Sequence, residues 1–236
     1  MGFFQQSIDR IRNAGIVGAG GAGFPTHIKL SGKNIDTVIA NGSECEPILS
    51  TDRVLMEIHA AELVAGLKLV VELTGASRGI VALKKHYHEA VAALAPLVEN
   101  EPSIQMHLLN DYYPAGDEHT LVTDVTGRLV PEGGIPLNVG VLVNNVGTLV
   151  QVHNAVYLNE PVTWKHVTVA GEVVQPGVYF VPVGLSFSDL VSVAGGIKPT
   201  HLNGQRKLTI VSGGPMMGNL ASFDNVVEKK TGGIFV

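Results

Sequence analysis

Four short segments of this sequence carry residue types that could bind a charged, ring-containing ligand. The first is a glycine-rich loop at residues 18–23 (GAGGAG), in which small side chains let consecutive backbone N–H groups converge on an anion. Lys29 lies six residues beyond the loop and adds a positive charge. The chemistry that this pattern predicts is phosphate binding. A turn that only serves packing is the alternative interpretation of the same residues.

The loop also matches the pattern G-x-G-x-x-G, which in dinucleotide-binding folds follows a strand and opens a helix. Here only Ile16 and Val17 precede the loop, and Pro25 interrupts the residues after it. The nearest acidic candidate for the ribose, Asp36, begins the next strand pattern instead of ending it. An ordinary NAD-binding Rossmann site is therefore disfavoured.

The other three segments place carboxylates and amides directly after apolar runs. The carboxyl ends of parallel strands lie at one edge of a sheet, where open α/β folds bind ligands. Each segment alone is equally typical of a solvated turn, but together they favour one shared crevice with polar recognition of a ring system. They are residues 41–47 (NGSECEP), 113–118 (YPAGDE) and 144–148 (NNVGT).

The elements that must position these segments alternate between strand and helix patterns. Continuous apolar runs predict strands, and apolar residues at helical spacing predict helices. This alternation predicts an α/β, Rossmann-like domain with a mostly parallel sheet covered on both faces. The expected strands are 36–40, 79–83, 104–109 and 139–143, and the expected helices are 8–14, 52–73, 86–98 and 146–157.

The pattern changes near Pro161, so we expect a first domain at residues 1–160 and a second at residues 161–236. Hairpin strands, one helix and a returning strand predict a small β-grasp unit in the second domain. The apolar end of the chain, TGGIFV, is typical of a strand that enters a further structure. The expected elements are strands at 166–170, 178–182 and 207–211 and a helix at 186–194.

Composition excludes several function classes. The net charge is −5 and no run of Lys or Arg exceeds a pair, which disfavours nucleic-acid binding. The single cysteine, Cys45, excludes an internal disulfide and a cysteine-ligated iron–sulfur cluster within this chain, and it fits the cytoplasm. No apolar run is long enough to span a bilayer. His86 and His88 lack partners at metal-ligand spacing, so we expect no metal site.

Taken together, the four polar segments resemble the RnfC and PduS family, which is related to the FMN- and NADH-binding subunit of respiratory complex I. Three later segments resemble the soluble-ligand-binding β-grasp domain of that family. The resemblance implies an NADH-dependent flavoprotein oxidoreductase, with FMN as cofactor and NADH as electron donor, that feeds cobalamin reduction. The later segments are 167–171 (VTVAG), 176–179 (PGVY) and 213–218 (GGPMMG).

Residue roles follow from the resemblance by position. Lys29 would neutralise the flavin phosphate, and Glu46 and Glu118 would stand at the catalytic positions. Compared with complex I, Ala19 replaces an arginine, while Leu30 and Gly32 replace aromatic residues that stack on NADH. The implied cofactor-binding residues are Gly18, Gly20, Gly21, Phe24, Lys29, Asn41, Glu44, Tyr113, Gly116, Asp117, Asn144, Asn145 and Thr148.

The resemblance also implies partners and a location. Iron–sulfur clusters would lie in a C-terminal part that follows this chain in a longer protein. Cobalamin or a cobalamin adenosyltransferase would be the partner, and the location would be the cytoplasm, inside a bacterial microcompartment. Two alternatives remain open. One is an RnfC-type peripheral subunit docked on a membrane electron-transport complex. The other is a non-catalytic module that docks a corrinoid or another partner.

Overall fold

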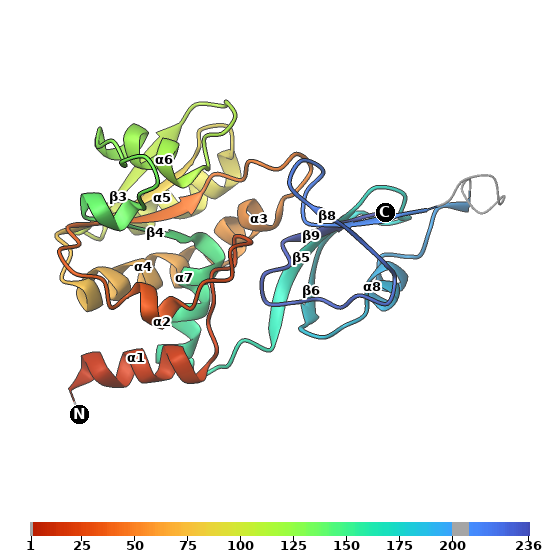
Figure 1. The fold of residues 1–236 in the computed structure, drawn as a ribbon, viewed down its shortest axis with the longest axis horizontal. Helices are drawn as coiled ribbons and strands as arrows, with labels where there is room; N and C mark the ends of the chain where they lie inside the picture. The colour runs from red at the N-terminus through yellow and green to blue at the C-terminus, as the bar shows by residue number, and fades with distance from the viewer. Residues whose placement is uncertain (1, 200–207) are drawn as a thin grey trace. The chain divides into compact units, whose positions relative to one another are not determined.

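The structure, a computed structural model, describes residues 2–199 and 208–236 and divides into two compact units (Figure 1). Two short segments from the N-terminal half of the chain belong to the second unit. The division therefore differs from the expected one into residues 1–160 and 161–236. The chain therefore leaves the first unit and returns to it twice before Pro161. The first unit contains Met1–Gly18, Phe24–Cys45 and Asp52–Pro161, and the second contains Ala19–Gly23, Glu46–Thr51 and Val162–Val236.

The first unit is built on a sheet of four parallel strands in the order β3-β2-β1-β4. On one face α4 (Ala60–Thr74) packs against both α5 (His88–Glu99) and α7 (Val146–His153), and α6 (Glu118–Thr126) covers the other face (Figure 1). The expected Rossmann-like α/β domain is thereby confirmed. The strands are β1 (Thr37–Gly42), β2 (Arg78–Lys84), β3 (Ile104–Leu109) and β4 (Val141–Asn145).

The helices follow the expected order, but some of their bounds differ and two helices are additional. His59 leaves the helical conformation, at φ −123° and ψ 32°, so the single helix expected at residues 52–73 is two helices. The helix expected at 146–157 ends earlier and continues as a π-helical turn, η2 (Asn154–Leu158). Helices α2 (Thr26–Lys29) and α6 (Glu118–Thr126) were not expected. The helices are α1 (Phe3–Asn13), α2 (Thr26–Lys29), α3 (Thr51–Ile58), α4 (Ala60–Thr74), α5 (His88–Glu99), α6 (Glu118–Thr126) and α7 (Val146–His153), with a short 3₁₀ turn, η1 (Pro136–Val139).

The second unit contains a mixed sheet in the order β6-β5-β9-β7-β8, with α8 (Phe187–Val193) packed on its core. β5 is antiparallel to β6 and parallel to β9, which confirms the expected β-grasp arrangement. Alternate residues of β5, Val167 and Val169, are fully buried against Phe187 and Leu190 of the helix. The strands are β5 (Trp164–Ala170), β6 (Gly177–Pro182), β7 (Ile210–Ser212), β8 (Asn219–Ala221) and β9 (Gly233–Phe235).

The apolar end of the chain has a different role from the one expected. β9 lies between β5 and β7 in the second sheet, so the strand predicted to enter a further structure pairs within this chain. Ile234 is fully buried, which explains the apolar sequence there. β8 was not expected, and the strand expected at 207–211 starts later, at Ile210. The first residue of that expected strand, Lys207, lies outside the described residues.

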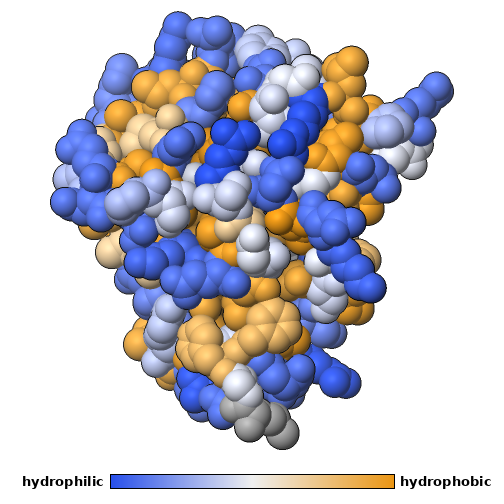
Figure 2. Space-filling model, turned by 90° about the vertical axis from the view of Figure 1, so that its left-hand side faces the viewer, coloured by the Kyte–Doolittle hydropathy of each residue, from blue (hydrophilic) through white to orange (hydrophobic). Residues whose placement is uncertain are grey.

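Among the described residues, no helix is long and apolar enough to cross a membrane. On the face that lies at the left of Figure 1, apolar side chains are interspersed with hydrophilic ones (Figure 2). Exposed apolar residues scattered in this way are normal for a folded protein and need no partner to explain them.

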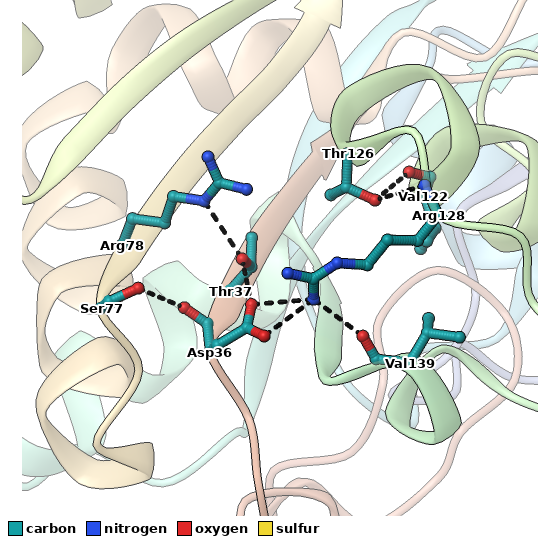
Figure 3. Close-up of polar contacts among 8 residues, drawn as sticks. All are labelled: Asp36, Thr37, Ser77, Arg78, Val122, Thr126, Arg128 and Val139. Atoms are coloured by element: carbon teal, nitrogen blue, oxygen red, sulfur yellow. Dashed lines mark hydrogen bonds and ion pairs between the residues drawn. The ribbon is translucent and has the colours of Figure 1, made fainter.

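A polar cluster fixes the amino end of β1, opposite the edge where ligands are expected (Figure 3). Arg128 Nη1 lies 2.9 Å from each carboxylate oxygen of Asp36 and donates to the Val139 carbonyl at 2.8 Å. Thr37 Oγ1 donates to Asp36 at 2.7 Å and accepts from Arg78 Nε at 3.2 Å. The cluster therefore ties the segment after α6 to the start of the central strand.

Replacing Asp36 with asparagine is expected to lower stability in a pH-dependent way. The hydrogen bond from Arg128 holds the pKa of Asp36 below its ordinary value of 3.8, so the folded state favours the carboxylate. This contribution is present above that value and is lost as the pH falls through the folded pKa. Because the pair is partly solvent-screened, we expect a loss of about 0.5–1 kcal/mol at pH 7.

Urea unfolding of wild type and Asp36→Asn at a series of pH values measures this contribution. The difference between them should shrink as the pH falls below 3.8. Asp224→Asn, at an exposed position of the second unit, is the control. A difference that stays constant down to the lowest pH would show that the ion pair is not its source.

Candidate functional site

The carboxyl edge of the first sheet has the topology that favours a ligand site. β1 and β4 are neighbours in the sheet although β2 and β3 lie between them in the chain, so the strand order reverses at this pair. Open α/β folds bind ligands at such a reversal. Asn41 faces Asn145 across the two strands, and Ala40 faces Asn144. The structure thus brings two of the predicted polar segments together at one point.

Two buried polar atoms at this edge have no hydrogen-bond partner among the described residues. They are Ser43 Oγ, just past β1, and Asn144 Nδ2, in β4. Ser43 is 5% exposed and Asn144 is 4% exposed. An unsatisfied buried group of this kind costs about 1–3 kcal/mol, so such groups usually mark a missing partner. Sequence reasoning named Asn144 but did not assign Ser43 to the site.

The segments after β1 and β3 are locked together at Gly116. Asn41 Nδ2 donates to the Gly116 carbonyl at 2.9 Å, and the Gly116 N–H donates to Cys45 Sγ at 2.9 Å. A Cβ atom at position 116 would lie 1.9 Å from the Ser43 carbonyl oxygen. Glycine is therefore required by the close approach of two backbones. Cys45 acts here as a hydrogen-bond acceptor for the backbone N–H of Gly116.

Two predicted site residues from distant parts of the sequence form an ion pair. Lys29 Nζ, at the end of α2, lies 3.3 Å from Glu118 Oε1, at the start of α6. The Lys29 side chain is 24% exposed, so its charge is only partly screened by water. Asp117 begins the same helix, where its carboxylate accepts from the backbone N–H groups of His119 and Thr120, both at 3.1 Å. One carboxylate oxygen of Asp117 is thereby used for helix capping.

Asn145 connects the end of β4 to two neighbouring elements. Its Oδ1 accepts from the Gly147 N–H at 2.8 Å and caps α7, while its Nδ2 donates to Asp52 at 2.7 Å. Thr148 is 1% exposed inside α7. The helix N-terminus therefore starts at the strand reversal and contributes a positive electrostatic potential there.

Tyr87, which follows β2 at the same edge, was not predicted. Its burial raises the pKa of the phenol to about 12, with the carboxylates of Glu44 and Asp52 acting in the same direction. At neutral pH the phenol keeps its proton, so it can donate a hydrogen bond and cannot serve as a base. The only feature of the sequence that could have assigned Tyr87 to this edge is its position as an aromatic residue after the second apolar run.

Other predicted residues are placed differently. Phe24 and Tyr113 are 50% and 57% exposed, so both rings are accessible to a ligand. The glycine loop closes through a hydrogen bond from the Gly18 N–H to the Phe24 carbonyl at 2.9 Å. Gly21 has φ +103°, and a Cβ there would meet nothing within 4 Å. Gly20 and Gly21 belong to the second unit, as does Glu46, so their predicted contacts with the flavin stay predictions.

A separate surface hollow runs along α6 and shares none of the predicted site residues. Its position on the outer side of one helix does not match the polar edge of the sheet. Its lining residues are His119, Thr120, Thr123, Asp124, Leu129 and Val130.

Comparison with known proteins gives two family matches. The model described as the Nuo51 FMN-binding domain matches residues 11–154, and the SLBB domain model matches residues 166–220. The cobalamin reductase PduS of Citrobacter freundii is 44% identical over 229 residues, which cover 97% of this chain and 49% of that protein. The chain spans about half the length of the curated relatives it matches.

Two further comparisons point in the same direction. A component of the Na(+)-translocating ferredoxin:NAD(+) oxidoreductase complex of Acetobacterium woodii is 35% identical, over 95% of this chain and 50% of that protein. The crystal structure of an NAD+-reducing [NiFe]-hydrogenase in the H2-reduced state superimposes with a TM-score of 0.77 at 26% identity, over 98% of this chain and 46% of that chain.

Proposed function

This chain belongs to the RnfC and PduS family, in which a Nuo51 FMN-binding domain precedes an SLBB domain, and on that premise we propose that its first unit binds FMN at the carboxyl edge of the sheet. The activity would be flavin-dependent electron transfer from NADH. FMN, when bound, would supply the chemistry by accepting a hydride from NADH and releasing electrons one at a time.

The single observation that carries this proposal is the pair of unsatisfied atoms, Ser43 Oγ and Asn144 Nδ2, at the strand reversal. A flavin offers ring carbonyls, ring nitrogens and ribityl hydroxyls, which suit one hydroxyl group and one amide donor. Asn41 would also face this ligand, and its second function of binding Gly116 keeps its amide oriented. The residues present therefore fit the cofactor that the family carries.

Two charged residues, Lys29 and Glu118, would lie close to the phosphate and the ring of the flavin. Lys29 would neutralise the phosphate, and its ion pair with Glu118 holds the ammonium group at this edge before a ligand arrives. Glu118 would stand beside the reacting face. The remaining residues of the proposed cofactor-binding set in the first unit are Gly18, Phe24, Glu44, Tyr113, Gly116, Asp117, Asn145 and Thr148. The protein would contribute orientation and electrostatics.

Replacing Lys29 with alanine is expected to weaken FMN binding by about 10- to 150-fold, because a hydrogen bond between charged groups contributes roughly 1.5–3 kcal/mol. Fluorescence titration of FMN measures the change. Lys33→Ala removes an exposed lysine from the same region and should leave the affinity unchanged. Equal affinities of wild type and Lys29→Ala would show that Lys29 does not contact the phosphate.

We extend the proposal to a longer protein that would contain this chain. Its electrons would pass through iron–sulfur clusters in a C-terminal part and reduce cobalamin, either directly or on a cobalamin adenosyltransferase. The location would be the cytoplasm, within a microcompartment. The similarity to PduS supports this, and the similarity to a component of an ion-translocating complex equally supports a peripheral electron-transport protein docked on a larger assembly.

A second candidate function, corrinoid docking by the second unit, is favoured by one observation. Trp164 and Phe180 stack at a ring-centroid distance of 5.4 Å, and the His166 ring lies 4.8 Å from Phe180. Trp164 is 50% exposed and Phe180 is 58% exposed, so the ring cluster is open to solvent. Such a surface would suit the flat aromatic base of a corrinoid's nucleotide, which gains from stacking on aromatic side chains.

Replacing Trp164 with alanine tests this second candidate. If the cluster binds a corrinoid, the affinity of the whole chain for cobalamin should fall by about tenfold, as expected for the loss of roughly 1.5 kcal/mol of stacking. Trp164→Phe keeps a ring and should retain most of the affinity. Absorbance titration gives the constants. No cobalamin binding by the wild-type chain would remove this candidate, and unchanged binding by Trp164→Ala would place the corrinoid elsewhere.

A further inference from the structure

Asp52, in the first turn of α3, is bonded to the end of β4, although 93 residues separate it from Asn145 in the sequence. Asn145 Nδ2 donates to Asp52 Oδ2 at 2.7 Å. The other end of the same amide, Oδ1, accepts from the Gly147 N–H at 2.8 Å and caps α7. Both polar ends of the Asn145 side chain are therefore engaged, and all three residues belong to the first unit.

The carboxylate of Asp52 determines which way the Asn145 amide points. A carboxylate only accepts hydrogen bonds, so the NH₂ end of the amide must face it. The oxygen end then faces the start of α7, where it can accept from a backbone N–H. A reversed amide would place its oxygen beside the carboxylate and its NH₂ group beside an N–H donor, so both hydrogen bonds would be lost. The cap of α7 therefore depends on Asp52.

Asp52 also lies close to residues that follow the neighbouring strands. Burial raises the pKa of Tyr87 to about 12, and the carboxylates of Glu44 and Asp52 act in the same direction. Glu44 follows β1, Tyr87 follows β2 and Asn145 ends β4, and these three strands are adjacent in the sheet. One carboxylate thus interacts with residues at the carboxyl ends of three adjacent strands.

The residue before Asn145 and the helix after it would both meet a ligand at this edge. Asn144 is 4% exposed, and its Nδ2 has no hydrogen-bond partner among the described residues. The amino end of α7 contributes a positive electrostatic potential at the same place. We propose that Asp52 is a positioning residue, which acts through Asn145 to hold the amino end of α7 and the Asn144 amide in the arrangement that binds the flavin.

This inference rests on the proposed FMN site and adds to it a residue that the sequence analysis did not assign. It also specifies how Asn145 would contribute. Because its side-chain amide is bonded at both ends, Asn145 would act through its backbone and through the helix that it caps. Loss of Asp52 would leave every flavin contact chemically intact but less well placed, and substitutions of this kind change affinity by about 2- to 30-fold.

Asp52→Ala, Asn145→Ala and the double variant test the proposal by fluorescence titration of FMN. Asp52→Ala should weaken binding by about tenfold. The double variant should be no weaker than Asn145→Ala, because without Asn145 there is no amide for Asp52 to orient. Asp52→Asn keeps a carbonyl acceptor and should recover part of the affinity. Glu57→Gln is the matched control, since it removes a carboxylate of the same helix that pairs with Arg53.

Two outcomes of these titrations would overturn the proposal. One is an affinity of Asp52→Ala equal to that of wild type. The other is a double variant whose loss is the sum of the two single losses, since Asp52 would then act independently of Asn145.

Hydrogen exchange of the Gly147 N–H, measured without flavin, tests the positioning role separately. Exchange should be faster in Asp52→Ala because the acceptor, Asn145 Oδ1, is no longer held in place. The Ile39 N–H in the central strand β1 is the reference, since a general loss of stability accelerates exchange at both positions. Unchanged exchange at Gly147, or equal acceleration at both, contradicts the positioning role. If wild type binds no FMN, the proposed function fails, and the exchange result still decides whether Asp52 orients Asn145.

Discussion

Replacing Gly116 with alanine is expected to abolish FMN binding and to lower the free energy of unfolding by about 2–3 kcal/mol. The added methyl group would lie 1.9 Å from the Ser43 carbonyl oxygen, a backbone atom that cannot rotate away. The segments after β1 and β3 would have to separate, which breaks the bonds from Asn41 to Gly116 and from Gly116 to Cys45. Urea unfolding and FMN titration measure the two effects.

A double variant separates the backbone clash from a side-chain clash at this position. The same methyl group would lie 3.0 Å from Cys45 Sγ, so Cys45→Ala could relieve only that smaller overlap. We therefore expect Gly116→Ala/Cys45→Ala to remain unable to bind FMN. Recovery of binding by the double variant, or normal binding by Gly116→Ala alone, would contradict the close approach of the two segments.

Replacing Gly66 with alanine is expected to destabilise the first unit by about 2 kcal/mol, although alanine is the better helix former. Helix propensity alone predicts a gain of about 1 kcal/mol inside α4. A Cβ at Gly66, however, would lie 2.1 Å from the Leu149 carbonyl oxygen in α7. Forcing these two helices apart costs more than the propensity returns, because overpacking typically costs about 1–3 kcal/mol and backbone atoms relax little.

Helix propensity and the clash with α7 predict changes of opposite sign in the free energy of unfolding, so the measured sign distinguishes between them. α7 begins beside Asn145, so its displacement should also weaken FMN binding. Urea unfolding of Gly66→Ala and of Gly177→Ala gives the comparison, since the second substitution adds a methyl group with room around it. A stabilised Gly66→Ala variant would mean that α4 and α7 do not approach as closely as the structure shows.

The sheet and its edge were predictable because they follow from local patterns. Continuous apolar runs such as those of β2 and β3 identify buried parallel strands. Polar segments that begin where those runs end must share one edge once the strands are parallel. For this reason Asn41 and Asn144, which are far apart in sequence, were assigned to one site, and their strands are paired in the structure.

The remaining features depend on contacts between segments that no local pattern encodes. Glycine is required at position 116 because the backbone of Ser43 lies so close to it. Ser43 Oγ has no hydrogen-bond partner among the described residues, and this can be seen only in the folded structure. The grouping of Glu46–Thr51 with the second unit arises from bonds to Thr168 and Gly232. Helix α6 was not predicted because Asp117, which caps it, was assigned to ligand binding alone.

The most direct test of the flavin site observes the Asn144 side chain while FMN is added. In two-dimensional ¹H–¹⁵N spectra the Asn144 amide pair can be assigned by its absence from Asn144→Ala. We predict a saturable shift of this pair in the wild-type chain as Nδ2 acquires an acceptor, and weaker binding by the variant. Saturable FMN binding that leaves the Asn144 resonances in place, or no FMN binding at all, would contradict the proposed site.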